Sequence, residues 1–328
     1  MKMKVTRKEL LRAAGAFALV APFGGIRGAY AQAYPSQDIR FVCAFPAGSG
    51  ADVLVRFFAE KVRPLANRTI LVENKVGAGG HIATEYVARS KPDGYTIYVF
   101  AATGVALMAG MFKKPPVDVA KSYQMAATIN RQSFMLVVDA KSPYKTVADL
   151  TAAMKAKGDK ATYATGAPPG TIMGEIYKNR TGVKAVEVNF RTAPDSLNEM
   201  LSGKIDYGMH DPVFSLAQMR EGRFRILAVS TGQRIGVIPD VPTMKESGVD
   251  MDMTIWWAAM VPAGTPKPIV DQINKWFSAV VASEEGKKFL NNFGGDQNIQ
   301  TPEQAQANFL AAIPQWTEFV KIAKLPLM

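Results

Sequence analysis

Short apolar runs alternate with segments of helical spacing along most of the chain. Residues 39–45 form an apolar run that predicts a buried strand, and residues 51–62 carry apolar side chains at the spacing of one helix face. The same alternation continues toward the C-terminus. It predicts strands over 69–72, 95–100, 134–138, 162–165, 183–188, 205–209 and 226–230, and helices over 82–89, 147–157, 171–180, 196–201, 268–282 and 302–321. Strands interleaved with helices are typical of an α/β protein with mainly parallel sheets.

The first thirty residues follow a different pattern. A basic stretch over 1–12 precedes an apolar, small-residue stretch over 13–23 and then Ala29-Tyr30-Ala31-Gln32-Ala33. This order predicts a secretory signal peptide over 1–31, cleaved after Ala31 or Ala33. The apolar stretch is shorter than the ~20 residues that span a bilayer. Cys43 is the single cysteine and has no disulfide partner. An exported chain without disulfides suits a bacterial periplasm better than a eukaryotic secreted scaffold, so the periplasm is the predicted destination.

The charge of the chain argues against one class of partner. Its 328 residues carry 39 Lys and Arg against 28 Asp and Glu, a formal net charge of +11, of which +5 lies in the first 31 residues. The remaining +6 is mild, and the basic residues are scattered among acidic ones. This pattern argues against a nucleic-acid partner and is compatible with a small anionic ligand.

The mature chain lacks a recognisable catalytic or metal-binding motif. His81 and His210 lie far apart and have no neighbours at metal-ligand spacing. A match to S-x-x-K over 142–145 precedes Thr146 and Asp149, which form a capping box at the start of a predicted helix. Because no nucleophile is accompanied by a base and a group that orients it, the sequence predicts that the protein is not an enzyme. It also predicts no cofactor and no metal ion.

Two glycine-rich loops of similar design follow predicted strands. They span 45–52 and 165–171, and each leads into a predicted helix. In open α/β sheets ligands bind at this end of the strands, where free N–H groups and the helix dipole favour an anion. The residues alone leave two alternatives open. Either two helix N-termini share an anion, or the glycines only allow tight turns.

Several short motifs occur in an order that resembles one protein family. They are Tyr34-Pro35-Ser36, Phe45-Pro46-Ala47-Gly48 with Asp52, Val72-Glu73-Asn74-Lys75, Gly77-Ala78-Gly79-Gly80, Lys91-Pro92-Asp93-Gly94-Tyr95-Thr96, Leu227-Ala228-Val229-Ser230, Ile238-Pro239-Asp240-Val241-Pro242-Thr243 and Val261-Pro262-Ala263-Gly264-Thr265-Pro266. In this order the mature chain resembles, nearly end to end, the substrate-binding proteins of tripartite tricarboxylate transporters, the Bordetella uptake gene (Bug) family.

The resemblance implies a two-lobed α/β periplasmic binding protein (type II, Venus flytrap) with a ligand cleft between the lobes. It implies lobe 1 over 34–133 and 255–328 and lobe 2 over 134–254. The implied function is capture of a small carboxylate, a di- or tricarboxylate or an aromatic acid, for delivery to the membrane subunits of a secondary transporter by a monomer without catalysis of its own. One alternative stays open: a periplasmic receptor that signals to a membrane sensor kinase.

The resemblance also places ligand-binding residues in loops of both lobes, where the family holds a carboxylate by backbone amides and hydroxyls. They are Ala47, Gly48, Ser49, Gly50, Asp52 and Thr103 in lobe 1, and Gly166, Ala167, Gly170, Thr171, Phe190, His210 and Asp211 in lobe 2. The chain departs from the family at Gly50 and Ala51, where Ser or Thr is common. It departs again at Pro168 and Pro169, which remove two N–H donors. Phe190 and His210 are further departures, because a Pro-Tyr-Lys-Gly-like stretch is common around the first and Met-Phe-Asp around the second.

Several of these assignments have a structural alternative. Asp52 can cap its own helix instead of binding the ligand. His210 can be a packing residue. Phe190 and Trp257 can wall an aromatic ligand or belong to the core. Arg191 is expected as a surface charge, although an arginine can also clamp a carboxylate with two hydrogen bonds.

Overall fold

The computed structural model describes residues 34–115, 117–325 and 327. Contacts between residues divide the chain into one unit of residues 1–36 and a second, compact unit of residues 37–328. The predicted signal peptide and both predicted cleavage sites, after Ala31 and after Ala33, lie outside the described residues. The second unit holds both β-sheets.

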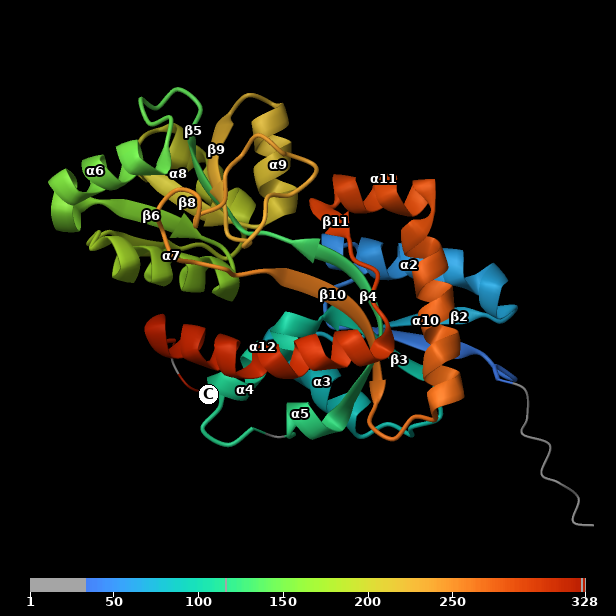
Figure 1. The fold of residues 1–328 in the computed structure, drawn as a ribbon. Helices are drawn as coiled ribbons and strands as arrows, with labels where there is room; N and C mark the ends of the chain where they lie inside the picture. The colour runs from blue at the N-terminus through green and yellow to red at the C-terminus, as the bar shows by residue number, and fades with distance from the viewer. Residues whose placement is uncertain (1–33, 116, 326, 328) are drawn as a thin grey trace, which may run out of the picture. The chain divides into compact units, whose positions relative to one another are not determined.

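Sheet A has six strands in the order β11-β4-β10-β3-β1-β2, and sheet B has five in the order β7-β6-β8-β5-β9 (Figure 1). The strands of sheet A are β1 (Ile39–Cys43), β2 (Ile70–Asn74), β3 (Thr96–Ala101), β4 (Tyr123–Gln132), β10 (Ile255–Pro262) and β11 (Gly295–Gln297). Those of sheet B are β5 (Met135–Asp139), β6 (Thr162–Thr165), β7 (Val186–Asn189), β8 (Tyr207–His210) and β9 (Phe224–Val229). We call residues 37–133 and 255–325, which carry sheet A, lobe 1, and residues 134–254, which carry sheet B, lobe 2.

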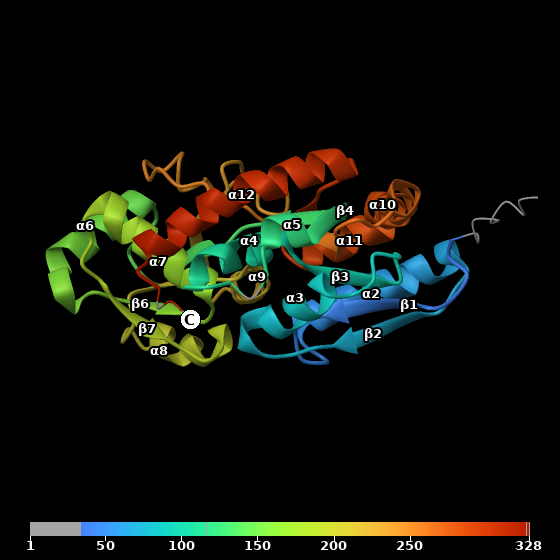
Figure 2. The same cartoon turned by 90° about the horizontal axis from the view of Figure 1, so that it is seen from below.

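Helices cover both sheets. In lobe 1 they are α2 (Gly50–Ala66), η1 (Ala78–Gly80), α3 (His81–Ala88), α4 (Ala102–Met111), α5 (Val119–Ser122), α10 (Lys267–Ala282), α11 (Glu284–Asn292) and α12 (Pro302–Ile322). In lobe 2 they are α6 (Val147–Lys157), η2 (Gly158–Lys160), α7 (Pro168–Thr181), η3 (Ala193–Ser196), α8 (Leu197–Leu201) and α9 (Pro212–Arg220). α12 packs against α4 and reaches α7 of lobe 2 (Figure 2). None of the helices in the described ranges combines the length and the apolar character needed to cross a membrane.

The prediction of mainly parallel sheets is wrong, because both sheets are mixed. β1 runs parallel to β2 and β3, and β6 runs parallel to β7 and β8. In contrast, β10 runs antiparallel to β3 and β4, β11 to β4, and β5 to β8 and β9. The cause is the path of the chain. β4 leads from lobe 1 to lobe 2 and β10 leads back, so these neighbouring strands must run in opposite directions.

Local sequence signals place several elements correctly. α6 and β6 have the predicted bounds, and the predicted capping box is present: Thr146 Oγ1 accepts from the Asp149 N–H at 3.1 Å, and Asp149 Oδ2 accepts from the Thr146 N–H at 3.0 Å. Cys43 is a fully buried strand residue, as predicted. The sequence did not predict β4, β10, α4 or α9.

A buried serine ties together the two crossings between the lobes. β4 continues into β5 through Ser133 and Phe134, and the chain returns to β10 through Met253 and Thr254. Ser230, at the end of β9, accepts a hydrogen bond from the Phe134 N–H at 3.0 Å and donates one to the Met253 carbonyl at 2.9 Å. The Ser230 N–H donates to Ser133 Oγ at 2.7 Å. The two crossing segments therefore share one buried hydrogen-bond network.

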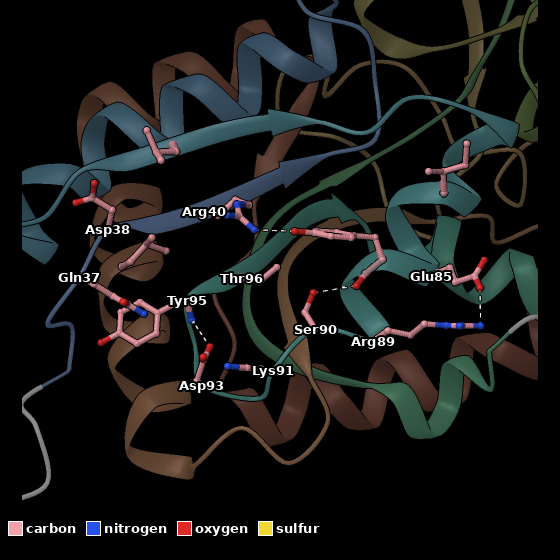
Figure 3. Close-up of a pocket in the computed structure, with 14 residues that line it drawn as sticks. Gln37, Asp38, Arg40, Glu85, Arg89, Ser90, Lys91, Asp93, Tyr95 and Thr96 are labelled. Carbon is pink, nitrogen blue, oxygen red and sulfur yellow. Dashed lines mark hydrogen bonds and ion pairs between the residues drawn. The ribbon is translucent and has the colours of Figure 1, made fainter.

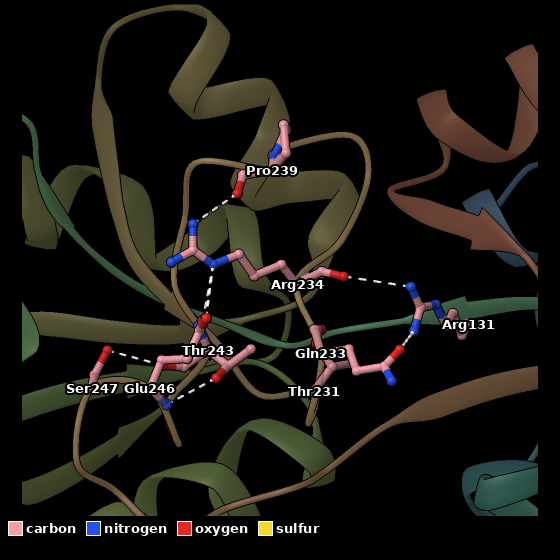
Figure 4. Close-up of polar contacts among 8 residues, drawn as sticks. All are labelled: Arg131, Thr231, Gln233, Arg234, Pro239, Thr243, Glu246 and Ser247. Carbon is pink, nitrogen blue, oxygen red and sulfur yellow. Dashed lines mark hydrogen bonds and ion pairs between the residues drawn. The ribbon is translucent and has the colours of Figure 1, made fainter.

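Further contacts join the lobes beside these crossings. Arg131 of β4 donates to Gln233 Oε1 of lobe 2 at 2.8 Å (Figure 4). The same guanidinium donates to Asp296 Oδ2 of β11 at 2.9 Å, and Asp296 Oδ1 accepts from the Gly236 N–H of lobe 2, also at 2.9 Å. Two strands of lobe 1 are therefore bonded to one loop of lobe 2.

Candidate functional site

Asp52 holds the first glycine loop in shape. Ser49 is the N-cap of α2, and its Oγ accepts from the Asp52 N–H at 3.2 Å. Asp52 Oδ2 accepts from the Gly48 N–H and from Arg56 Nε, both at 2.8 Å, and Oδ1 accepts from Asn74 Nδ2 at 2.7 Å. The residue is only 1% exposed. Its carboxylate is committed to the loop, which favours the capping alternative over a ligand contact.

The charge of Asp52 is retained despite its burial. Burial by itself would raise the pKa of Asp52, but hydrogen bonds from Arg56, Asn74 and the Gly48 N–H outweigh this effect and hold the pKa below its ordinary value. The Arg56 guanidinium offsets the negative charge at 2.8 Å. The start of α2 is thereby kept close to electrically neutral.

The start of α2 keeps two backbone donors available. The first N–H groups of a helix have no partner within the helix. The Ser49 hydroxyl accepts a hydrogen bond from the N–H of Asp52. The N–H groups of Gly50 and Ala51 donate to no other group in the described part of the chain. Gly50 is exposed, as is Ala47 before it. An anion here would meet two amide donors and the positive end of a 17-residue helix.

The start of α4 lies beside this loop. β1 and β3 are neighbours in sheet A, so the segments that follow them are adjacent. Thr103, in the first turn of α4, is 2% exposed, and its Oγ1 has no hydrogen-bond partner among the described residues. It lines a cavity of about 420 Å³ together with Thr254 and Trp256. Thr103 thus lies at the same end of sheet A as the first loop, next to the crossings between the lobes.

Aromatic side chains pack behind the first loop. The ring centroid of Phe45 lies 5.5 Å from that of Phe100 and 6.2 Å from that of Trp257. The ring centroid of Trp257 lies 6.0 Å from that of Phe293. Trp257 is 6% exposed, and its Nε1 donates to Gln132 Oε1 at 2.8 Å. This placement favours the core alternative for Trp257, while Phe45 and Phe293 are half-buried.

The second glycine loop is packed against neighbouring backbone. A Cβ added to Gly166 would lie 2.5 Å from the Ala193 nitrogen, and one added to Gly170 would overlap the carbonyl oxygen of Met209. Any larger residue would displace the backbone at either position. These two glycines are therefore required by close packing, whatever else the loop does.

The start of α7 is poor in backbone donors. Pro168 and Pro169 have no N–H, and the N–H groups of Gly170 and Thr171 donate to the Ala167 carbonyl at 2.9 and 3.3 Å. The two glycine loops are therefore not equivalent, because α2 keeps amide donors that α7 lacks.

A carboxylate that the sequence reasoning missed lies beside the second loop. Glu187 of β7 accepts hydrogen bonds through Oε1 from Thr171 Oγ1 at 2.5 Å and from Thr165 Oγ1 at 2.6 Å. Thr171, predicted as a ligand hydroxyl, is 6% exposed. The pairing of β6 with β7, which aligns Thr165 with Asn189, brings Glu187 to this place.

His210 and Phe190 pack inside lobe 2. His210 is 1% exposed, lies edge-on to Phe214 with ring centroids 5.2 Å apart, and stacks near Phe224 at 6.4 Å. Its Nε2 lies 3.1 Å from Ser196 Oγ. Phe190 is half-buried against the same hydrophobic cluster. The placement of both residues favours the packing alternative over a ligand contact.

The remaining predicted residues have clear local surroundings. Asp211 is the N-cap of α9, and its carboxylate accepts from the Phe214 N–H at 3.0 Å. Removal from water raises the pKa of Asp211, although backbone N–H groups act in the opposite direction. Arg191 is exposed, in agreement with the predicted surface charge.

A sizeable cavity of the structure does not coincide with the glycine loops. It has a volume of about 820 Å³ and is lined by the segments that begin β1 and β3 and by α3 (Figure 3). Its lining mixes charges of both signs, and Arg40 donates to the Tyr86 hydroxyl at 2.6 Å there. The cavity lies at the amino ends of the strands, opposite to the ends that carry the glycine loops. It therefore does not belong to the predicted ligand site.

Comparison with known proteins gives the family. A family model described as the tripartite tricarboxylate transporter family receptor, TctC, matches residues 54–322. The chain belongs to the TctC family. This confirms the family expected from the sequence motifs, which is one of periplasmic binding receptors.

Individual relatives agree with this assignment to the TctC family. A UPF0065 protein of Bordetella bronchiseptica is 31% identical over 300 residues, covering 90% of this chain and 88% of the relative. The solved structure of R. palustris Rpa4515 with adipate matches 89% of this chain and 99% of its own with a TM-score of 0.77 and 26% identity. The solved structure of the periplasmic binding protein BugD matches 89% of this chain and 99% of its own, with a TM-score of 0.73 and 29% identity. These structures confirm the predicted two-lobed α/β fold.

Proposed function

We propose that this protein is an exported solute receptor that captures a small organic acid between its two lobes and delivers it to the membrane subunits of a tripartite tricarboxylate-type transporter. In this proposal the signal peptide is removed after Ala31 or Ala33, and the mature monomer works in the periplasm. The binding residues lie in the loops that follow β1, β3 and β6.

The arrangement at the start of α2 carries the proposal. The N–H groups of Gly50 and Ala51 have no partner in the described part of the chain, and the charge of Asp52 is offset by Arg56. A carboxylate placed there would receive two hydrogen bonds and interact favourably with the helix dipole. Membership of a receptor family and the adipate bound by a relative of 26% identity support the same ligand class.

A thermal-shift screen tests the proposal. A ligand that binds only the folded state at a hundredfold excess over its Kd should stabilise the protein by about 2.7 kcal/mol. We expect this shift from at least one acid in a panel of aliphatic and aromatic mono- and dicarboxylic acids. The matched controls are the amide and alcohol analogues of the acid that binds. A shift with sugars or amines but with no acid would contradict the proposal.

Closure of the lobes on the ligand gives a second test, at Gly294. A Cβ at this position of lobe 1 would lie 2.6 Å from Pro212 Cβ of lobe 2. Gly294→Ala should therefore keep the lobes apart and weaken binding of the acid about tenfold or more, a loss of about 1.4 kcal/mol. Isothermal titration calorimetry with the best acid from the screen measures this loss.

Gly203→Ala is the matched control for this test. Gly294 and Gly203 have φ values of +79° and +76°, so alanine has a similar backbone cost at both, but a Cβ at Gly203 meets no atom within 4 Å. The control should lose stability without losing affinity. Equal affinities of the two variants would show that contact at Gly294 is not part of closure.

A further inference from the structure

Glu187 changes the chemistry of the loop at the start of α7. It lies on β7, half-buried, and Oε1 accepts from Thr165 Oγ1 at 2.6 Å and from Thr171 Oγ1 at 2.5 Å. A hydroxyl has one proton to donate and lone pairs that accept. Both protons are given to Glu187. Thr165 is completely buried, so Thr171, which is 6% exposed, is the hydroxyl of this pair that a ligand can meet, and it offers only lone pairs.

The negative charge of Glu187 has no cation against it. None of the ion pairs in the described part of the chain includes Glu187. On the same lobe, Lys178 pairs instead with Glu175 at 2.6 Å. An approaching carboxylate would meet an unneutralised like charge on this side of the site.

The backbone in the first turn of α7 does not compensate for this charge. Pro168 and Pro169 have no N–H, and those of Gly170 and Thr171 already donate to Ala167. The N–H groups of Gly166 and Ala167, ahead of the helix, donate to no other group in the described part of the chain. The first turn of α7 itself, beside Glu187, presents acceptors where the first turn of α2 presents free donors.

We infer that Glu187 sets ligand specificity by requiring a hydrogen-bond donor, an ammonium or a hydroxyl group, at the ligand end that meets Thr171. This inference rests on the proposed function. The ligand class is a monocarboxylic acid whose carboxylate meets the start of α2 and whose far end carries the donor. A second carboxylate at the far end is disfavoured, because it would face Glu187 and the Thr171 hydroxyl, whose proton is already donated to Glu187.

Calorimetric titration with length-matched acids tests the inference at pH 7.5. The sets are succinate with 4-hydroxybutanoate and 4-aminobutanoate, adipate with 6-hydroxyhexanoate and 6-aminohexanoate, and terephthalate with 4-(hydroxymethyl)benzoate. In the set that binds best, the donor-bearing acid should bind wild-type protein about tenfold or more tightly than the dicarboxylate, since one like-charge contact costs at least about 1.4 kcal/mol.

Two matched variants assign this preference to Glu187. Glu187→Gln removes the charge and should reduce the preference about tenfold. Glu175→Gln removes the same charge from lobe 2 but touches neither Thr165 nor Thr171, and it should leave the preference unchanged. If Glu187→Gln does not fold, Thr171→Val should weaken the donor-bearing acid and spare the dicarboxylate, while Thr171→Ser should restore wild-type binding.

The outcomes separate the inference from the proposed function. A dicarboxylate that binds wild-type protein as tightly as its donor-bearing partner overturns the role of Glu187 and leaves an acid receptor. An unchanged preference in Glu187→Gln, or in Thr171→Val where that variant replaces it, does the same. Binding of none of the acids overturns both.

Discussion

Replacing Gly170 with alanine should destabilise the protein by about 3 kcal/mol, the upper end of the cost of overpacking a close-packed site. The added Cβ would overlap the carbonyl oxygen of Met209 and lie 3.5 Å from the Phe134 ring. A backbone carbonyl in a strand cannot rotate away as a flexible side chain can, so β8 or the start of α7 must shift. Urea unfolding followed by circular dichroism measures the loss.

Gly50→Ala is the matched control, because Gly50 also lies in the first turn of a helix. The nearest atom to its added Cβ, in the Phe293 ring, lies 3.9 Å away, so alanine fits there without a clash. The free energy of unfolding should stay unchanged or rise slightly, since alanine favours the helix. Equal unfolding free energies for both variants would show that the second loop does not approach Met209 as closely as described.

Acid should destabilise the protein through His210. Burial lowers the pKa of His210 to about 4, while a histidine in an unfolded chain has a pKa of about 6.5. Between these values the unfolded chain binds a proton that the folded chain does not. This contribution to stability is therefore complete above pH 6.5 and is lost as the pH falls toward 4. From pH 7.5 to 4.5 the loss should be about 2 to 3 kcal/mol.

The variant His210→Gln isolates this contribution. Glutamine cannot take up the proton, so its unfolding free energy should fall less between pH 7.5 and 4.5 than that of wild-type protein. His81→Gln leaves His210 in place and should retain the His210 part of the slope. Parallel pH profiles for wild-type protein and His210→Gln would mean that the imidazole is not shielded from water in the folded state.

The fold was predictable where local signals determine it. α6 begins at a capping box formed by Thr146 and Asp149, which are three positions apart in the sequence. β6 coincides with a short strand-like segment that has clear ends. β10 is buried along its whole length, and α4 is buried on most of its surface, so neither shows the alternation or the amphipathic spacing that marks an exposed element. Strand direction depends on where the chain crosses between the lobes, and no local pattern contains that information.

The same distinction applies to the candidate site. Asp52 interacts with its own helix start within one turn, so a capping role for it was among the alternatives the sequence offered, whereas the role of Ser49 as the N-cap of α2 was not predicted. Glu187 and Thr171 are 16 positions apart in the sequence. Their hydrogen bond forms only because β6 and β7 pair in the observed register. The direction of the His210 ring, toward Phe214 and Phe224, likewise depends on how β8 sits in sheet B.

A crystal structure of the mature protein with its tightest-binding acid tests the central proposal most directly. We predict one carboxylate hydrogen-bonded to the N–H groups of Gly50 and Ala51, with the far end of the ligand at Thr171. An acid held instead by lysine or arginine side chains, or lodged in the cavity at the amino ends of β1 and β3, would contradict the proposal.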